Sequence, residues 1–366
     1  MNSERLGIPA VHILLLAPSK TPIGGYKVAY EYANALVQLG IPVTVWHSES
    51  FSGIDGHRRH FRRAAKSLLA WWLRGQRTEW LRNGVTWFDL DPHITVRSTG
   101  WFPRIRLSNG DAVIATAVQT MTFAGRLASR RHARSAALIQ HYETWAASPE
   151  AIAEAWSAVD ERIVIAPWLA EKCAEFGLDS HLLPNALVAD SFPVGPPVVD
   201  RPMKVLSLLS PHGYKRPDVV IGALERILAK RPNTDVWAFG PVQDRPEMDP
   251  RIHYVPDPSP EALREMYQTS RVYLCGSDEE GWHLPPAEAT LSGAAVVSTD
   301  IGGVRASMAE DALYSPRGDS EALAAHALEV LDTPEAAQRR IDRARARLLE
   351  TTYLKNASTL KSILGV

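Results

Sequence analysis

Short apolar segments alternate with helix-length segments along most of this chain of 366 residues. A strand that is covered by helices on both faces reads as a nearly continuous apolar run, so the alternation predicts parallel sheets between layers of helices. In the first half of the chain, the expected strands are Val11–Ala17, Val43–Trp46, Ala112–Thr116, Ala137–Gln140 and Arg162–Ala166. In the second half, they are Lys204–Leu209, Asp235–Phe239, Ile252–Val255, Val272–Cys275 and Ala295–Thr299.

Helices are expected between these strands. In the first half of the chain, the expected helices are Tyr26–Leu39, Val118–Arg130, Pro149–Ala158 and Leu169–Phe176. In the second half, they are Pro217–Ala229, Pro260–Thr269, Pro285–Leu291 and Ser320–Leu331. Residues from about 334 to 364 predict two further helices with a break near Thr351–Tyr353.

One stretch interrupts the alternation, at residues 192–202, which read FPVGPPVVDRP. Its prolines exclude a helix or a central strand, so we interpret it as a linker between two doubly wound α/β domains. A hydrophobic content of 45% and a charged content of 22% fit a soluble globular protein. The formal net charge of −1 argues against a nucleic-acid-binding surface that extends over the whole chain.

The cysteines and the first strand bear on the cellular compartment. Cys173 and Cys275 have neither metal-ligand spacing nor a disulfide motif, which favours a reducing compartment. The apolar run Val11–Pro18 is too short to span a bilayer, and it lacks the flanks of a signal peptide. We therefore expect a cytoplasmic protein.

The segment Glu279–Ala289 places Glu280 and Glu288 eight positions apart. Pro285 and the proline after it fit only in the first turn of a helix. The unpaired N–H groups and positive dipole end of that helix would then face Gly281, where no side chain blocks a ligand. This arrangement suits a phosphate flanked by sugars whose hydroxyls the carboxylates accept. The alternative is an ordinary loop-to-helix junction with two solvated glutamates.

Together with Trp282, Leu284 and Ala289, this segment reads EGWHLPPAEA. It resembles the E-x7-E signature of glycosyltransferase family 4, the retaining glycosyltransferases of the GT-B fold, whose usual wording is close to EGFG-LP-x-x-EA. The resemblance implies an α/β protein with two doubly wound, Rossmann-like domains that face a central cleft and a C-terminal helix that crosses back to the N-terminal domain.

The same resemblance implies a division of labour between the domains. Residues 1–195, with the C-terminal helix 353–366, would bind the acceptor, and residues 203–352 would bind the nucleotide sugar. In RPMKVLSLLSPHGYKRPDVVIGAL, Lys215 lies on a loop between a strand and a helix. Such loops lie at the carboxyl edge of a parallel sheet, where these folds bind ligands, and a lysine there supplies a compact charge to a diphosphate. A plain surface lysine is the alternative.

Two further features lie in the first half of the chain. Gly24 and Gly25 separate the first strand from its helix without a G-x-G-x-x-G pattern, so they form either a simple turn or a place where the backbone approaches the phosphate of the donor. His141 ends a strand in ALIQHYETW, and the resemblance assigns it a hydrogen bond to the donor sugar near the reacting carbon. The implied catalytic residues are His141, Glu280 and Lys215. The implied donor-binding residues are Gly24, Gly25, Lys215, Arg216, Gly281, Trp282, His283, Leu284 and Glu288.

Two departures from the family pattern stand out. Ser210 occupies the position, five residues before Lys215, where the family often has an arginine that clamps the diphosphate. The residues that could replace it are His212, Arg216 and Arg305. In PNALVADSF, Ala186 stands where the family has glycine, which puts the positioning of the donor by that loop in doubt.

The resemblance implies a retaining, metal-independent transferase that uses a nucleotide-diphosphate sugar and no cofactor. IQ-x-x-E at Gln140–Glu143 and APWLAEK at Ala166–Lys172 are similar to the rhamnosyltransferase branch, which implies dTDP-rhamnose, or else a UDP- or GDP-sugar, as donor. The acceptor would be a glycan, a lipid-linked acceptor or a small molecule. Alternatives are a GT-B epimerase and a non-catalytic protein that binds nucleotide sugars or glycans. Asp89-Leu-Asp91 is a D-x-D motif, but such short matches occur by chance, and we expect no metal site.

The segment His57–Arg82 contains seven arginines, one lysine and a single acidic residue, interleaved with tryptophans and leucines. This composition suits the headgroup region of an anionic membrane. We therefore expect peripheral association with the inner face of the plasma membrane and a possible lipid-linked acceptor. Nucleic-acid binding is a weaker alternative that we do not expect, and a solvated basic helix packed by its tryptophans is the third.

Overall fold

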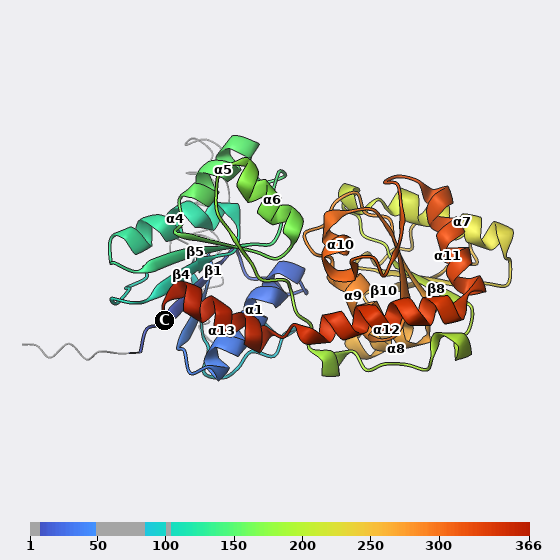
Figure 1. Cartoon of the computed structure of the whole chain (residues 1–366), viewed down its shortest axis with the longest axis horizontal. Helices are drawn as coiled ribbons and strands as arrows, with labels where there is room; N and C mark the ends of the chain where they lie inside the picture. The colour runs from blue at the N-terminus through green and yellow to red at the C-terminus, as the bar shows by residue number, and fades with distance from the viewer. Residues whose placement is uncertain (1–7, 49–84, 100–103) are drawn as a thin grey trace, which may run out of the picture. The chain divides into compact units, whose positions relative to one another are not determined.

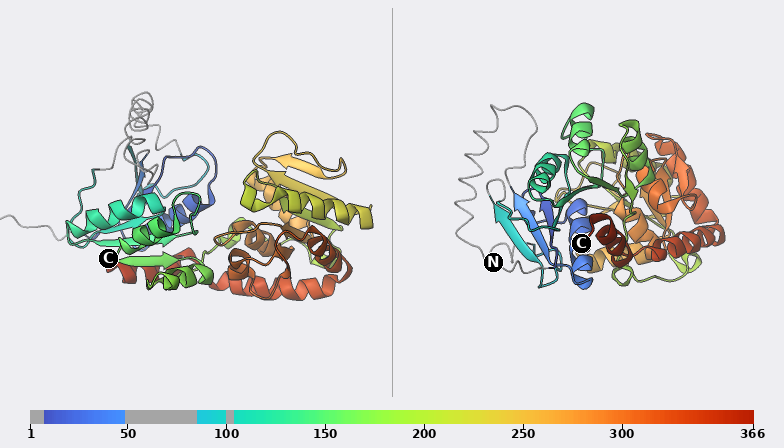
Figure 2. Two further views of the ribbon diagram at one scale, coloured as in Figure 1. Left: turned by 90° about the horizontal axis from the view of Figure 1, so that it is seen from above. Right: turned by 60° about the vertical axis from the view of Figure 1, so that its left-hand side comes forward.

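The computed structural model describes residues 8–48, 85–99 and 104–366. The chain divides into two compact units, of which unit 1 comprises Met1–Asn185 and Tyr353–Val366 and unit 2 comprises Ala186–Thr352. In Figures 1 and 2, each unit consists of a sheet with helices packed against it. This is the doubly wound, two-domain α/β architecture that the sequence predicts.

The described part of unit 1 contains a seven-stranded sheet with the order β3-β2-β1-β4-β5-β6-β7, and all neighbouring strands are parallel. Its strands are β1 (Val11–Leu15), β2 (Val43–Ser48), β3 (Thr95–Thr99), β4 (Ala112–Ala115), β5 (Arg134–Ile139), β6 (Glu161–Val164) and β7 (His181–Leu182). Its helices are α1 (Gly24–Gln38), α4 (Val118–Ser129), α5 (Pro149–Ser157), α6 (Pro167–Glu175) and α13 (Tyr353–Leu364).

Unit 2 contains a six-stranded parallel sheet with the order β10-β9-β8-β11-β12-β13. Its strands are β8 (Lys204–Leu208), β9 (Asp235–Gly240), β10 (His253–Pro256), β11 (Val272–Cys275), β12 (Ala295–Thr299) and β13 (Leu313–Ser315). Its helices are α7 (Pro217–Lys230), α8 (Pro260–Thr269), α9 (Leu284–Leu291), α10 (Gly302–Met308), α11 (Ser320–Asp332) and α12 (Pro334–Glu350).

The strand order creates one switch point in each unit. The chain builds outward from the first strand, then returns to its other side, so the connections diverge between β1 and β4 in unit 1 and between β8 and β11 in unit 2. Loops that leave neighbouring strands in opposite directions open a crevice at the carboxyl ends of those strands, where open α/β sheets bind ligands.

The C-terminal helix returns to unit 1, as the sequence analysis expects. Helix α12 belongs to unit 2, and the chain then passes through Thr351 and Thr352 to α13, which packs on α1. The ring of Tyr353 meets that of Tyr32 edge to face at 5.5 Å between centroids. Asn356 Nδ2 donates a hydrogen bond of 2.7 Å to the carbonyl oxygen of Pro184.

The interpretation of residues 192–202 as a linker is wrong, because this stretch is anchored inside unit 2, which begins at Ala186. The guanidinium of Arg201 is buried and donates hydrogen bonds to four backbone carbonyls. The acceptors are the carbonyl oxygens of Pro196 (2.8 Å), Tyr267 (3.2 Å), Ser270 (2.8 Å) and Ser292 (2.8 Å). Three of them lie at the ends of α8 and α9, where unpaired carbonyls and the helix dipole favour a cation. The domain boundary therefore lies after Asn185 rather than after residue 195.

Three strands escaped the sequence analysis, and each lies at or near a sheet edge. Strand β3 reads TVRST, so its side chains are too polar for a continuous apolar run. Strands β7 and β13 have two and three residues, which is too short for any periodicity to appear. Central strands such as β1, which is buried at every position, were predicted.

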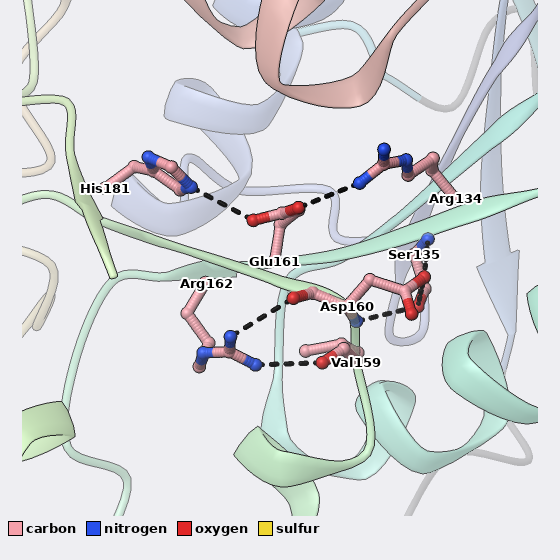
Figure 3. A network of polar contacts seen from close by, with 7 residues as sticks. All are labelled: Arg134, Ser135, Val159, Asp160, Glu161, Arg162 and His181. Atoms are coloured by element: carbon pink, nitrogen blue, oxygen red, sulfur yellow. Dashed lines mark hydrogen bonds and ion pairs between the residues drawn. The ribbon is translucent and has the colours of Figure 1, made fainter. Parts of the chain in front are cut away.

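A polar network ties the amino ends of β5, β6 and β7 together (Figure 3). Glu161 bonds both Arg134 Nη1 and His181 Nε2 at 3.0 Å, and Asp160 accepts a hydrogen bond of 2.7 Å from the hydroxyl of Ser135. Arg162 donates to the backbone carbonyls of neighbouring turns. Because this network lies at the edge opposite to the carboxyl ends of the strands, we assign it a structural role.

The basic, tryptophan-rich segment at residues 57–82 lies outside the described residues. Within the ranges that the structure does describe, no helix has the length and apolar character needed to span a membrane.

Candidate functional site

The loops that leave β8 and β11 bring Lys215 and Glu280 together at the switch point of unit 2. Lys215 ends a short 3₁₀ turn (Gly213–Lys215) before α7, and Glu280 precedes α9. Lys215 Nζ donates a hydrogen bond of 2.5 Å to Glu280 Oε1. The sequence analysis selected both residues, which lie 65 positions apart, and the structure places them in one ion pair.

Glu280 is almost fully buried, with 6% of its surface exposed, and three donors face the same carboxylate oxygen. Besides Lys215, the hydroxyl of Ser277 donates to Oε1 at 2.9 Å, and Nε2 of His283 lies 3.5 Å from it. Burial opposes ionisation, but the opposing effects of His283, Lys215 and Ser277 prevail and lower the pKa of Glu280. The site therefore holds an ionised carboxylate at neutral pH.

A glycine allows helix α10 to approach this carboxylate closely. A Cβ atom on Gly303 would lie 2.4 Å from the backbone oxygen of Glu280 and 2.7 Å from its Cβ, so only glycine fits there without a shift of the backbone. The sequence analysis did not select Gly303. Its signal was the IGG sequence after the apolar strand β12, which could have been recognised as a point of close approach.

Two helices at this site start from residues with left-handed backbone geometry. Arg216, the N-cap of α7, has φ 48°, and His283, the N-cap of α9, has φ 57°. This region is costly for residues other than glycine, and such strain is concentrated at functional sites. Pro217 and Pro285 follow in the first turns, as the sequence analysis predicts for Pro285.

The second glutamate of the pair is also buried. Glu288 lies within α9, has 7% of its surface exposed and accepts a hydrogen bond of 3.2 Å from the hydroxyl of Tyr267. The alternative of two solvated glutamates is therefore wrong. The sequence did not indicate Tyr267 as a partner, because it comes from α8, 21 positions earlier.

The remaining residues of the motif pack beside the two glutamates. Trp282 is 3% exposed, Gly281 is buried and Leu284 is half-buried. A small pocket with room for about one water molecule, about 10 Å³, lies next to Lys215 and His283. Its lining residues are Leu208, Lys215, Tyr273, Leu274, Cys275, Gly276, Ser277 and His283.

The candidates for the missing diphosphate clamp already have partners inside unit 2. Arg216 pairs with Asp218 at 2.7 Å and with Asp278 at 3.0 Å. Arg305 pairs with Asp300 at 2.8 Å and with Glu310, which follows α10 in the chain, at 2.7 Å. The ring of His212 stacks on Tyr214 at 5.6 Å between centroids. Ser210 itself is buried.

The candidates in unit 1 gather at the carboxyl ends of β1 and β5. Gly24 and Gly25 form the first residues of α1, and Gln140 Nε2 donates a hydrogen bond of 3.0 Å to the carbonyl oxygen of Gly25. His141 follows Gln140 directly, so the glycine turn and the histidine lie on neighbouring segments. Neither glycine has a positive φ, so the absence of side chains, rather than the backbone conformation, is what distinguishes this helix start.

Two tryptophans flank His141, and the sequence analysis missed both of them. The ring of Trp145 meets the imidazole edge to face at 4.6 Å between centroids, and that of Trp168 does so at 5.8 Å. Trp145 comes from the β5–α5 loop and is 61% exposed, whereas Trp168 is half-buried in the first turn of α6. Trp145 thus presents a largely exposed aromatic ring next to the histidine.

Glu143 completes this edge of unit 1. Its Oε2 accepts a hydrogen bond of 2.8 Å from the backbone N–H of Val118, the first residue of α4. Burial raises the pKa of Glu143 to about 7, and the hydrogen bond from Val118 offsets only part of this effect. The two polar residues of the Q-x-x-E pattern thus each hydrogen-bond the backbone at the start of a helix, Gln140 at α1 and Glu143 at α4.

Asp89 and Asp91 form a turn packed on α1. Asn34 Nδ2 donates to the carbonyl oxygen of Asp89 at 3.0 Å, and Oδ1 of Asp91 is 2.8 Å from both the backbone nitrogen and Nδ1 of His93. In the part of the chain that the structure describes, no group of three or more His, Cys, Asp or Glu side chains has the arrangement of a metal site.

Unit 2 therefore joins Lys215, Glu280 and His283 in direct contact, with Arg216 next to Lys215 in the chain. Glu288 reaches Tyr267 instead. Gly24, Gly25 and His141 belong to unit 1 and form a separate group.

Comparisons with known proteins place these groups in a family context. Residues 204–333, which contain Lys215, Glu280 and Glu288, match the family described as "Glycosyl transferases group 1". Comparison with curated protein sequences gave no match.

Several solved structures share the fold of the whole chain. Sucrose-phosphate synthase from Thermosynechococcus elongatus aligns with a TM-score of 0.69 at 14% identity, over 97% of this chain and 98% of that one. Anabaena HepE in complex with UDP aligns with a TM-score of 0.70 at 14% identity, over 97% and 99%. S. aureus TarM in complex with Fondaparinux, alpha-GlcNAc-glycerol and UDP aligns with a TM-score of 0.67 at 10% identity, over 98% and 100%. The chain thus has the GT-B fold, and its unit 2 carries a domain similar to the group 1 glycosyltransferases.

Proposed function

We propose that this protein is a retaining, metal-independent glycosyltransferase of family 4 that uses a nucleotide-diphosphate sugar. The observation that carries the proposal is the ion pair between half-buried Lys215 and buried Glu280 at the switch point of unit 2, inside the segment that matches the glycosyltransferase family. A cation for phosphate and an ionised acceptor for sugar hydroxyls stand side by side there.

In the proposed mechanism, the bond between the donor sugar and its phosphate breaks first. The departing phosphate takes the proton of the acceptor hydroxyl, which attacks the same face of the sugar, so the anomeric configuration is retained. Lys215 and the N-terminus of α9 stabilise the charge that develops on the diphosphate. In this proposal, the diphosphate takes the place of the Glu280 carboxylate as the partner of Lys215. Lys215 is thus a catalytic residue and the sole cation that we assign to the clamp.

The other proposed roles follow from the contacts of each residue. Glu280 binds hydroxyls of the transferred sugar, and Glu288 binds the ribose, with Tyr267 holding its carboxylate. The backbone at Gly281 and the start of α9 complete the donor site. In unit 1, the glycine turn at Gly25 approaches the donor phosphate, and His141 hydrogen-bonds the sugar near the reacting carbon.

The identity of the donor nucleotide has to be determined by experiment. The hydrogen bonds of Gln140 and Glu143 to the starts of α1 and α4 account for the Q-x-x-E pattern without a rhamnosyl donor. Candidate donors remain dTDP-rhamnose and UDP- or GDP-sugars. The solved structure of Anabaena HepE contains UDP-glucose, which makes UDP the first nucleotide to try. The acceptor would be a glycan or a lipid-linked sugar, whose ring the exposed face of Trp145 suits.

A thermal-shift screen tests the proposal directly. Wild-type protein is mixed with dTDP, UDP, GDP and ADP and with their sugar derivatives. A nucleotide present at 100 times its dissociation constant stabilises the folded state by about 2.7 kcal/mol, so one of them should raise the melting temperature clearly. Transfer to acceptors should then persist in EDTA. If no nucleotide shifts the melting temperature, the proposal is wrong.

Association with an anionic membrane through residues 57–82 is also proposed, on composition alone. The protein should sediment with anionic vesicles at low salt and not with neutral ones. Raising the salt concentration should release it, because screening shortens the reach of these charges, to about 8 Å at physiological ionic strength.

A further inference from the structure

His283 carries a backbone conformation that its residue type disfavours. Its φ of 57° and ψ of 89° lie in the left-handed region, and the motif that this segment resembles has glycine at the position. The side chain is buried, with 4% of its surface exposed, so it is not a solvated histidine that tolerates a turn. A strained and buried residue at a candidate site requires a compensating role.

The two ring nitrogens of His283 face two different groups. Nδ1 lies 3.3 Å from Sγ of Cys275 at the end of β11, and Nε2 lies 3.5 Å from Oε1 of Glu280. A carboxylate only accepts hydrogen bonds, so we assign the ring proton to Nε2, the nitrogen that faces it. Nδ1 is then an acceptor 3.3 Å from Sγ of Cys275, whose thiol also has the hydroxyl of Ser277 within 3.7 Å. Burial lowers the pKa of His283 to about 4, so the ring is neutral at pH 7.

The polar groups that contact the carboxylate of Glu280 approach the same oxygen atom. Within the described residues, Lys215, Ser277 and His283 all approach Oε1. When a diphosphate draws Lys215 away, the hydroxyl of Ser277 and Nε2–H of His283 are the donors that still hold Oε1. The 3.5 Å separation is long for a hydrogen bond, but such contacts commonly shorten when a ligand binds.

We propose that His283 is a positioning residue that holds Glu280 through Oε1 and presents Oε2 to a hydroxyl of the transferred sugar. The inference rests on the proposed function, in which Glu280 binds the donor sugar. It predicts that the imidazole affects recognition of the sugar and leaves recognition of the nucleotide unchanged. A glycine at this position would remove the strain together with the support.

Calorimetry with UDP and UDP-glucose tests this role on the full chain. The variants are His283→Ala, which keeps the left-handed strain, His283→Gly, which removes it, and Glu280→Ala as the reference for loss of the sugar contact. His132→Gly is the matched control, since His132 is an exposed histidine in unit 1 with φ 52°.

Wild-type protein should bind UDP-glucose more tightly than UDP. Both His283 variants should lose about tenfold of this preference, with less than a twofold change in UDP affinity. His283→Gly should melt about 2–4 °C above His283→Ala because glycine carries no left-handed penalty. His132→Gly should keep the preference. If Glu280→Ala loses the preference and the His283 variants keep it, the inference is wrong and the proposed function stands. If Glu280→Ala keeps it too, the proposed role of Glu280 fails.

A second measurement needs no ligand. In ¹⁵N-histidine-labelled protein, the signals that disappear in His283→Gly belong to His283. They should show a neutral ring protonated at Nε2 at pH 7. A ring protonated at Nδ1, or a charged ring, overturns the inference. This result holds whether or not UDP-glucose is the donor.

Discussion

Glu143 in unit 1 and Glu280 in unit 2 are both largely buried carboxyl groups at the carboxyl edge of a parallel sheet, yet their pKa values move in opposite directions. Glu143 bonds the backbone N–H of Val118, and its pKa is raised to about 7 by burial. Glu280 meets burial as well, but its surroundings lower its pKa. The two sheets have the same strand order up to the last strand, so topology does not cause the difference.

The difference comes from the loops. The loops of unit 2 surround Glu280 with His283, Lys215 and Ser277, whereas the helix that starts at Val118 contributes a backbone donor and about half a charge spread over its first turn. These partners together outweigh the effect of burial on the pKa of Glu280, and the single helix N-terminus does not do so for Glu143. The edge of unit 2 therefore holds an ionised carboxylate beside a lysine, whereas the carboxyl group at the edge of unit 1 titrates near neutral pH.

Removing the ammonium group of Lys215 should reduce the difference between the surroundings of Glu143 and Glu280. We expect this substitution to have the largest effect. Lys215→Ala should lower turnover by about 10²–10³-fold, because the charge of the diphosphate grows in the transition state. The affinity for nucleoside diphosphate should fall relative to that for the nucleoside. Lys172→Ala is the control, since that lysine forms an exposed ion pair with Glu175 in unit 1. A wild-type ratio of the two affinities in Lys215→Ala would exclude this lysine as the phosphate ligand.

Arg201 is a buried cation whose hydrogen-bond acceptors are backbone carbonyl oxygens. Substituting it tests how strongly such neutral acceptors stabilise a buried charge. Its guanidinium is held by carbonyl oxygens at helix ends, and burial lowers its pKa to about 10. Arg201→Met should reduce the free energy of unfolding by about 2–4 kcal/mol, since several buried carbonyls lose their donor. Urea unfolding measures this. Arg251→Met, at an exposed pair with Asp249, should leave the midpoint in place. An unchanged midpoint for Arg201→Met would mean that residues 186–202 are not anchored through this side chain.

The two glutamates of the motif should separate sugar from nucleotide recognition. Glu288→Ala should weaken nucleotide binding by about tenfold or more, since a hydrogen bond to a charged group contributes roughly 1.5–3 kcal/mol. Glu280→Ala should reduce turnover more than nucleotide affinity. Calorimetry and initial rates on the same preparations measure both. The reverse ranking would mean that the two assignments are exchanged. Tyr267→Phe should resemble a weaker form of Glu288→Ala under either assignment, because its hydroxyl contacts Glu288.

The sequence predicted the central strands and most helices because their side chains are constrained by burial on both faces, as in β1 and β12. It also selected Lys215, Glu280 and Glu288 as candidates, through the proline-marked helix start, the spacing of the carboxylates and the family resemblance, and the structure brings Lys215 and Glu280 into contact. It failed where the determining contact is distant. Pro196 and Val198 look like linker residues until Arg201 is seen to join that segment to the ends of α8 and α9.

The same limit applied to the partners of the site residues. Tyr267 reaches Glu288 from another helix, and Trp168 reaches His141 from another βα unit. Side chains of this kind have no fixed spacing from the residue they contact. The left-handed conformation of His283 was hidden for a different reason, because a histidine gives no signal for positive φ in the way that a glycine does.

The last prediction concerns the direction in which the stability changes with pH because of Glu143. A carboxyl group whose pKa is higher in the folded than in the unfolded state binds its proton more strongly when folded. Its contribution is therefore most favourable below its unfolded value, near 4.5, and is lost as the pH rises through about 7. The carboxylate of Glu280, whose pKa is lowered, contributes in the opposite direction and loses its contribution as the pH falls.

Glu143→Gln removes the titration and keeps an oxygen that can accept from Val118 N–H. Relative to wild type, this variant should therefore gain about 2 kcal/mol of stability as the pH rises from 5 to 8, because the wild-type protein holds a buried negative charge at this position only at the higher pH. Glu280→Gln should lose stability relative to wild type over the same interval or show no gain. Urea midpoints at pH 5, 6, 7 and 8 provide the measurement. Parallel curves for wild type and Glu143→Gln would show that Glu143 is ionised in the folded state throughout, so that the helix N-terminus alone keeps a buried carboxylate charged and the contrast between the two edges has another cause.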